Sequence, residues 1–336
     1  MGRQKYTIRD IAREAGISIA TVSRYMNRSG YVDAATAEKI EEVVKRLGYV
    51  PSRMAQALKT KKSRQLMLIV PDIGNPFYSG LARSVQAYTK EKSYAVTLYN
   101  TNEDPREELL AVEMASRILS DGIILCSVHT APHVVEALQR LSVPVVLANS
   151  YEHACFDTVH GIRGQGTYLS TMHLLDSGHR LIGFAGGPGD SEIASRRKYG
   201  FLKALDEQNC SFSEDYCFEM GFSMQAGYKA GRYFSSLSPR PTAICCANDL
   251  IAFGILASFN EMGINVPDEI SLTGMDDIPF AELTRPRLTT VTNDSGDYGK
   301  SVAALLFDRM EGTYGGPPRE VVIPRRLIVR DSVKQL

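Results

Sequence analysis

Polar and aromatic side chains that could hold a small molecule follow several short apolar runs in the larger, later part of the chain. Runs such as LMLIV at 66–70 and TAICCA at 242–247 have the composition of buried strands. Ligands of parallel sheets bind beyond the carboxyl ends of the strands, so we expect these side chains to converge on a cleft. The candidates are Asp72, Asn75, Phe77, Tyr78, Asn149, Arg197, Phe222, Asn248, Asp249 and Asp276. Aromatic rings, amides, carboxylates and one guanidinium suit a small polar ligand with hydroxyl or carboxylate groups. A second interpretation stays open for Asn248 and Asp249, because such residues also cap turns and helices.

Residue patterns for catalysis or metal binding are missing from the sequence. The six histidines and six cysteines show no zinc-ligand spacing, and no G-x-S-x-G motif occurs. The glycines at 186–189 follow an apolar run, but Pro188 removes an amide that a phosphate would need. Asp276 and Asp277 are adjacent, which makes a poor acid and base pair. We therefore expect neither an enzyme nor a bound metal or cofactor.

A second kind of chemistry is indicated at residues 7–27, TIRDIAREAGISIATVSRYMN. Ile8, Ile11, Ala12 and Ala15 fall on one face of a helix that Thr7 and Asp10 can cap, and Gly16 ends it. Ser18 can cap a second helix with Val22 facing the first. This pattern predicts a helix-turn-helix, although an ordinary helical hairpin would have the same periodicity. A third helix is predicted from Ala34 to Leu47, between Asp33 and Gly48.

The distribution of charge favours nucleic acid as the partner of this segment. The chain of 336 residues has 38 basic and 38 acidic side chains. Residues 1–64 contain 14 of the basic and 6 of the acidic ones, a net charge of +8, so the remainder has −8. Local cations of this kind neutralise DNA phosphates. Residues 52–64 end in a basic run that reads either as a solvated linker or as a helix that folds only on DNA.

From residue 66 onward, short apolar runs alternate with amphipathic helical stretches, which is typical of parallel βαβ units. The count predicts an α/β body with two doubly wound parallel sheets in tandem, and segments after residue 288 that cross back between them. There is no leader-like apolar segment after Met1 and no run of 18 apolar residues. We therefore expect a cytoplasmic, nucleoid-associated protein that does not enter the membrane.

The sequence resembles the LacI/GalR family of bacterial transcription regulators along nearly its whole length. The motifs that carry the resemblance are TIRDIAREAGIS with ATVSRYMN, GYVPSRMAQAL, DIGNPFY, DSGHRLIGFAGG, ANDLIAFG, VPDEISLTGMDD and RPRLTTV. The resemblance implies a homodimer that binds a palindromic operator in double-stranded DNA. It also implies a periplasmic-binding-protein-like body whose cleft holds an effector: a sugar, sugar acid, sugar phosphate or purine-like molecule. A repressor is the expected function, with an activator or, from another class, a solute-binding protein as alternatives.

The same resemblance assigns roles to individual residues. Ile19, Ala20 and Arg24 would meet base edges, with Arg24 able to make a bidentate contact to guanine. The backbone of the DNA would be held by Thr7, Thr21, Ser23 and Asn27. The hinge helix would contact DNA through Ser52, Ala55 and Leu58, with Leu58 inserted into the minor groove. The effector would be contacted by Tyr78, Asn149, Arg197, Phe222, Asn248 and Asp276.

The expected domains are a headpiece over 1–50, a hinge over 51–64 and a body over 65–336. Within the body, one lobe would comprise about 65–160 and 293–325, and the other about 161–292 and 326–331. Ile19 and Ala20 resemble the catabolite-control subgroup of the family more than the lactose repressor. A tetramer is not expected, because no heptad repeat follows Val329.

Overall fold

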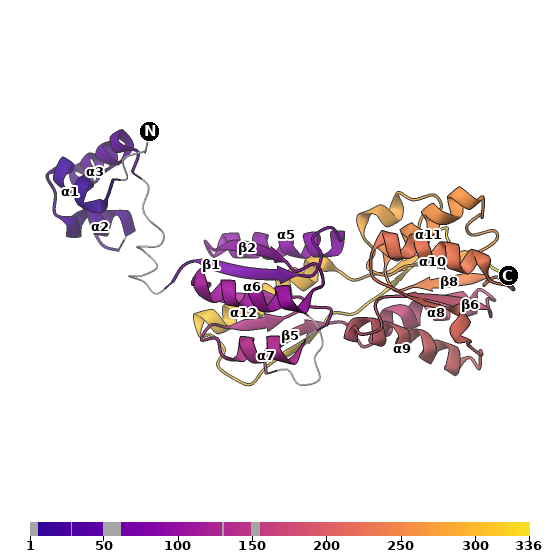
Figure 1. Ribbon diagram of the computed structural model, residues 1–336. Helices are drawn as coiled ribbons and strands as arrows, with labels where there is room; N and C mark the ends of the chain where they lie inside the picture. Colours follow the sequence, from indigo (N-terminus) through magenta and orange to yellow (C-terminus); the bar gives the residue numbers. More distant parts are fainter. Residues whose placement is uncertain (1–5, 28, 50–61, 130, 149–154) are drawn as a thin grey trace. The chain divides into compact units, whose positions relative to one another are not determined.

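The computed structural model describes residues 6–27, 29–49, 62–129, 131–148 and 155–336. The chain divides after Arg64 into two compact units. Within the described residues, no helix combines the length and apolar character needed to cross a membrane. The first unit is a helical headpiece, and the second is an α/β body of two lobes (Figure 1).

The headpiece is a three-helix unit built around a small apolar core. Its helices are α1 (Ile8–Ala15), α2 (Ile19–Asn27) and α3 (Ala34–Leu47). The predicted cap of α1 is confirmed, since the Thr7 and Asp10 side chains each accept a hydrogen bond from the other residue's backbone amide. Ile11 and Val22 from the first two helices pack against Ile40 of α3, and all three side chains are fully buried. The core is small, so capping contributes a large share of the stability of this unit.

The first lobe of the body contains a six-stranded parallel sheet in the order β11-β5-β4-β3-β1-β2. Its strands are β1 (Gln65–Val70), β2 (Ala95–Asn100), β3 (Gly122–Leu125), β4 (Val145–Leu147), β5 (Asp157–His160) and β11 (Glu320–Val322). Leu66, Leu68 and Val70 face the helices α5 (Pro76–Glu91) and α12 (Ser295–Glu311). Met67 and Ile69 face α6 (Pro105–Arg117) and α7 (Pro132–Gln139) on the other side. Burial on both faces explains why β1 is apolar throughout.

The second lobe contains a four-stranded parallel sheet in the order β7-β6-β8-β9. Its strands are β6 (Ile182–Gly186), β7 (Cys217–Glu219), β8 (Ala243–Cys246) and β9 (Ser271–Thr273). The helices are α8 (Gln165–Asp176), α9 (Glu192–Glu207), α10 (Met224–Ser236) and α11 (Asp249–Met262), with short 3-10 turns at Glu214–Tyr216 and Pro279–Glu282. The prediction of two parallel sheets with helices on both faces is confirmed.

Three short segments connect the lobes, and we call them the crossovers. They are residues 161–164 after β5, 292–294 after β10 (Thr290–Val291), and 323–326 between β11 and β12 (Leu327–Ile328). Strands β10 and β12 pair antiparallel on the side of the second lobe. The last part of the chain, yellow in Figure 1, therefore passes between the lobes twice.

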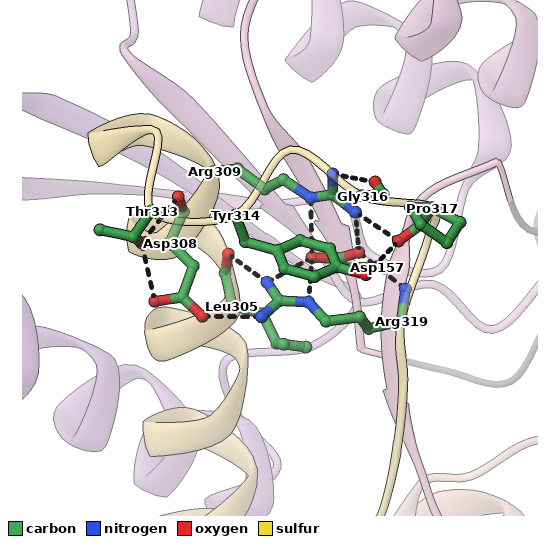
Figure 2. Close-up of polar contacts among 9 residues, drawn as sticks. All are labelled: Asp157, Leu305, Asp308, Arg309, Thr313, Tyr314, Gly316, Pro317 and Arg319. Carbon is green, nitrogen blue, oxygen red and sulfur yellow. Dashed lines mark hydrogen bonds and ion pairs between the residues drawn. The ribbon is translucent and has the colours of Figure 1, made fainter.

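A buried carboxylate ties three distant parts of the first lobe together (Figure 2). The Asp157 side chain is fully buried, and its Oδ1 lies 2.6 Å from Arg309 Nη2 on α12. Its Oδ2 lies 2.8 Å from Arg319 Nη2, just before β11. The Tyr314 ring packs against both guanidiniums, whose centres lie 4.6 and 4.0 Å from the ring centroid. Burial alone would raise the pKa of Asp157, but the hydrogen bonds from Arg309 and Arg319 outweigh it and lower the pKa.

This arginine and aspartate cluster also explains why strand β5 does not stand out as an apolar run in the sequence. Strand β5 was not predicted, because its first residue is a charged aspartate and the strand is only four residues long. The aspartate is tolerated in a buried strand because two arginines pair with its carboxylate. These arginines lie about 150 residues later in the sequence, so the local sequence does not reveal the pairing. Edge strand β11 pairs with β5, so the same cluster fixes the start of the third crossover.

Candidate functional site

The exposed face of α2 presents the residues that the resemblance assigns to DNA bases. Ile19, Ala20 and Arg24 are all exposed, while Val22 is fully buried against the other two helices. The Ser18 hydroxyl accepts a hydrogen bond from the Thr21 amide at 3.1 Å, which confirms the predicted cap of α2. The aliphatic part of Arg24 lies against Gly30, so its guanidinium is presented from a supported stem. An exposed helix with an apolar edge and one arginine is suited to entry into a major groove.

Other predicted DNA contacts are already held by hydrogen bonds within the headpiece. The Thr7 hydroxyl donates to Asp10 Oδ2 at 2.8 Å as part of the cap. Asn27 donates from its side-chain amide to the Ser23 carbonyl at 2.8 Å. These two side chains are therefore pre-positioned at the ends of α1 and α2.

Four predicted site residues lie outside the described residues. They are Ser52, Ala55, Leu58 and Asn149. Their proposed contacts remain predictions from the sequence.

The body has a cleft lined by both lobes and by the three crossovers. Five of the six predicted effector contacts line it: Tyr78, Arg197, Phe222, Asn248 and Asp276. These residues are separated by up to about 200 positions in the sequence. The prediction that side chains following the strands converge is therefore confirmed for these five residues.

Arg197 and Asp276 face each other across the second-lobe side of the cleft. Arg197 Nη2 lies 3.9 Å from Asp276 Oδ1, which is a loose ion pair. Arg197 also donates from Nη1 to the Ala247 carbonyl at 2.7 Å, and its guanidinium centre lies 5.0 Å from the centroid of the Phe222 ring. Burial lowers the pKa of Arg197, opposed by the charge of Asp276. Both groups have hydrogen-bonding capacity left for a ligand.

The Asp276 carboxylate is held in place by an unusual backbone and one amide. Its φ of +119° is rare for a residue with a side chain, and such strain is concentrated at functional sites. Asn293 Nδ2 of the second crossover donates to Asp276 Oδ1 at 3.1 Å. Burial raises the pKa of Asp276, whereas Arg197 and Asn293 act to lower it. The fixed geometry leaves Oδ2 to accept a hydrogen bond from a ligand.

Asp249 lies behind Asp276, and both of its carboxylate oxygens are hydrogen-bonded within the protein. Its Oδ1 accepts from the Thr290 hydroxyl at 2.6 Å, and its Oδ2 accepts from the Ile278 amide at 2.9 Å. Burial and the negative charge of Asp276 raise the pKa of Asp249 to about 7. Although it follows a strand, Asp249 does not line the cleft.

Asn248 also has structural contacts that support the cap interpretation of the sequence. Its side-chain oxygen accepts from the Ile251 amide at the start of α11, and its nitrogen donates to the Phe222 carbonyl, both at 2.8 Å. A side chain at Gly187 would collide with the Phe222 ring. Gly187 therefore makes room for an aromatic wall of the cleft, which is the role of a glycine in the 186–189 segment.

Sequence reasoning missed several cleft residues. Glu103 enters from the loop after β2, where Asn102 and Glu103 both have left-handed backbones, with φ of +52° and +62°. Burial and the neighbouring Asp72 raise the pKa of Glu103. The sequence indicated one guanidinium, but Arg163, Arg196, Arg197 and Arg325 all line the cleft. Glycines at 161 and 166, which make room for Arg325, were the available signal.

Comparison with known proteins identifies the family of this two-part chain. Residues 7–52 match the family described as "Bacterial regulatory proteins, lacI family", and residues 171–333 match the "Periplasmic binding protein-like domain". The "Catabolite control protein A" of Priestia megaterium is 32% identical over 98% of this chain and 99% of its own length. The chain belongs to the LacI family of bacterial regulators. It is therefore a DNA-binding transcriptional regulator.

Two further comparisons describe relatives of this LacI-family protein. The "HTH-type transcriptional repressor PurR" of Mannheimia succiniciproducens is 29% identical over 98% of this chain and 99% of its own length. A solved structure of the "transcriptional regulator CelR-cellobiose complex" is 27% identical, with a TM-score of 0.74, and covers 98% of this chain and 100% of its own. Both match the headpiece and the body together, so the pairing of these two units is common to these proteins.

Proposed function

We propose that this LacI-family protein is a repressor that binds a palindromic operator as a homodimer and releases or tightens on it when a small polar ligand enters the cleft. The sign of the ligand response would depend on the ligand. We infer that the ligand is bound without chemical conversion. The protein would act at the nucleoid in the cytoplasm.

The proposal for DNA binding rests on the exposed face of α2. Arg24 can pair with a guanine in the major groove, and each such bidentate contact contributes about 1–3 kcal/mol of discrimination. Ile19 and Ala20 offer only apolar contacts. Much of the remaining specificity would then come from Leu58 of the hinge, through deformation of the DNA.

The observation that carries the ligand response is the composition of the cleft. Its polar groups come from both lobes and from all three crossovers, so a bound molecule contacts the segments about which the lobes would rotate. A ligand that fits one lobe angle better than another shifts the population of that state. The proposed dimer would have one hinge segment in each subunit, and each is too short to form a stable helix alone. A small change in the distance between the two hinges would then decide whether they fold on DNA.

In vitro selection from a pool of random DNA duplexes is the test of operator recognition. The full-length protein is expected to enrich an inverted repeat, and Arg24→Ala is expected to weaken binding to it by about 5- to 150-fold. Binding to an unrelated duplex should change little, because non-specific affinity depends on phosphate contacts. Arg13→Ala removes an exposed arginine from α1 and is the matched control. Selection of no inverted repeat would contradict the proposal.

The ligand response is tested separately with the selected operator. Fluorescence anisotropy would measure operator affinity with and without each candidate ligand, and sedimentation would measure the dimer. Arg197→Ala should abolish the response and leave the operator affinity of the ligand-free protein unchanged. Retention of the response in Arg197→Ala would reject the assigned site.

A further inference from the structure

Arg325 is a cleft residue whose guanidinium forms no ion pair with a carboxylate among the described residues. It belongs to the third crossover, between β11 and β12. Its Nε is buried and has no hydrogen-bond partner among the described residues. Its Nη1 contacts Met275 Sδ at 3.2 Å, and sulfur is only a weak acceptor. No ion pair joins Arg325 to any described carboxylate, whereas Arg196 in the same cleft is paired with Glu192.

Glycines from distant parts of the chain leave room for the Arg325 side chain. A side chain at Gly161 in the first crossover would collide with its guanidinium. A methyl group at Gly166, at the start of α8, would come within 2.9 Å of its Nη1. The backbone amide of Arg325 donates to the Gln165 side chain at 3.3 Å. A packing site of this kind fixes the direction of the side chain, which a solvated arginine does not need.

Arg325 shares its surroundings with the Arg197 and Asp276 pair. Its positive charge acts on Asp276, and its guanidinium is a hydrogen-bond partner of the buried Tyr298 hydroxyl; both residues line the cleft. Arg197 and Arg325 therefore share the Asp276 carboxylate, which lies 3.9 Å from Arg197, and Arg197 also acts on Glu103. A partly buried cation that has no close ion pair and shares its counter-ion is stabilised when a ligand supplies a further negative charge.

We propose that the ligand carries an anionic group, a carboxylate or a phosphate monoester, which binds between Arg325 and Arg197. The inference rests on the proposed function and specifies the class of ligand for the same cleft. Asp276 and Glu103 then accept hydrogen bonds from hydroxyl groups on the rest of the molecule. The class is therefore a small polyhydroxylated acid or phosphate ester rather than a neutral sugar or a purine base. Since Arg325 lies on a crossover, its contact with the anion places the bound charge at the junction of the lobes.

The test compares matched probes on dialysed full-length protein by isothermal titration calorimetry. The probes are D-glucose, D-glucuronate and D-glucose 6-phosphate, the corresponding galactose set, D-glucitol with D-gluconate and 6-phosphogluconate, and adenine and inorganic phosphate alone. At least one acid or ester should bind tenfold or more tightly than its neutral counterpart. The carboxylate and phosphate arms show which of the two anions is used. If no acid or ester binds, or if a neutral member binds equally well, the proposal is wrong.

Substitution of Arg325 identifies the residue responsible. Arg325→Met should weaken the anionic probe at least tenfold and change its neutral counterpart less than twofold. Arg326→Met removes the same charge from the neighbouring exposed position and is the matched control, expected to change neither probe. Equal weakening of both probes in Arg325→Met would assign a structural role to Arg325 instead.

Two further measurements keep the test decisive. Arg325→Lys preserves the charge without the planar fork, so it should fold even if Arg325→Met does not, and its preference for the anionic probe should be weaker than that of the parent protein. If the Kd values of Arg325→Lys for both the anionic and the neutral probe equal those of the parent protein, the proposal is contradicted. Operator affinity is measured in the same samples. A neutral sugar that alters operator affinity would preserve the proposed function and reject the anion, whereas a missing operator would reject the proposed function alone.

Discussion

Two regions of the body place two arginines beside one aspartate, and they differ in how completely the charges are satisfied. In the first lobe, Asp157 accepts close hydrogen bonds from Arg309 and Arg319, the shortest at 2.6 and 2.8 Å. In the cleft, Asp276 lies 3.9 Å from Arg197, and Arg325 has no described carboxylate partner. In the first cluster the protein satisfies the hydrogen-bonding capacity of the carboxylate, whereas in the second cluster part of that capacity is available to a ligand.

The difference indicates how to separate structural from functional charge clusters in this protein. Removing a buried carboxylate that is saturated by protein donors leaves its partners uncompensated and is strongly destabilising, and such a carboxylate has no capacity for a ligand. The cleft cluster has a long ion pair between Arg197 and Asp276, an arginine without a paired carboxylate among the described residues, and a strained backbone at Asp276. A ligand can therefore form hydrogen bonds and ion pairs that the protein itself does not form. The two clusters should therefore respond to mutation in opposite ways.

The largest effect is expected for Asp157→Asn. The change removes the charge that compensates two partly buried guanidiniums, so the free energy of unfolding of the body should fall by about 3–5 kcal/mol. Denaturation by urea, followed by circular dichroism, would measure it. Asp308→Asn is the matched control, because Asp308 pairs with Arg319 from a half-exposed position. It should cost less than about 1 kcal/mol. A loss of similar size in both variants would remove the distinction between saturated and exposed partners.

A smaller effect on stability and a clear effect on binding are expected for Asp276→Asn. The variant should raise the Kd of the cleft ligand by about 10- to 100-fold, since a hydrogen bond to a charged group contributes about 1.5–3 kcal/mol. Its free energy of unfolding should stay within about 1 kcal/mol of the parent protein. Calorimetric titration and urea denaturation measure the two quantities. If Asp276→Asn destabilises the body as strongly as Asp157→Asn, the contrast between the clusters fails.

A pH dependence of stability is expected from Asp249 behind the cleft. Folding raises the pKa of this carboxyl from 3.8 to about 7, so the protonated form favours the folded state. This contribution is present below pH of about 4 and is lost as the pH rises to about 7. Relative to Asp249→Asn, the parent protein should become steadily less stable across this range and change little above it. Unfolding midpoints of both proteins between pH 4 and 8 would check this, and a constant difference would contradict it.

The sequence was sufficient for the parts of the site that depend on regular structure. Tyr78, Arg197, Phe222 and Asp276 follow from the rule that parallel strands present their carboxyl ends at one edge. The headpiece was predictable for the same reason, since its caps and its apolar period are local.

The parts that could not be predicted depend on residues that are distant in sequence. Arg325 reaches the cleft because two glycines, more than 150 positions earlier, leave space for its side chain. Glu103 reaches the cleft because Asn102 and Glu103 both adopt the left-handed backbone. Asparagine often adopts this backbone, but glutamate rarely does, so the turn could not be predicted. Strand β5 was missed because its buried aspartate has partners that only the folded sheet brings near. In each case the spacing of apolar residues contains no information about the contact.

The three crossovers determine how this protein can be recombined with its relatives. The headpiece joins the rest of the chain once, near residue 64, so exchanging it with another regulator requires a single junction. Each lobe of the body is assembled from separate stretches, and exchanging one lobe requires three compatible junctions at 161–164, 292–294 and 323–326. Two of those junctions supply Asn293 and Arg325 to the cleft. New pairings of operator and ligand should therefore arise more readily by replacing the headpiece than by exchanging half of the binding site.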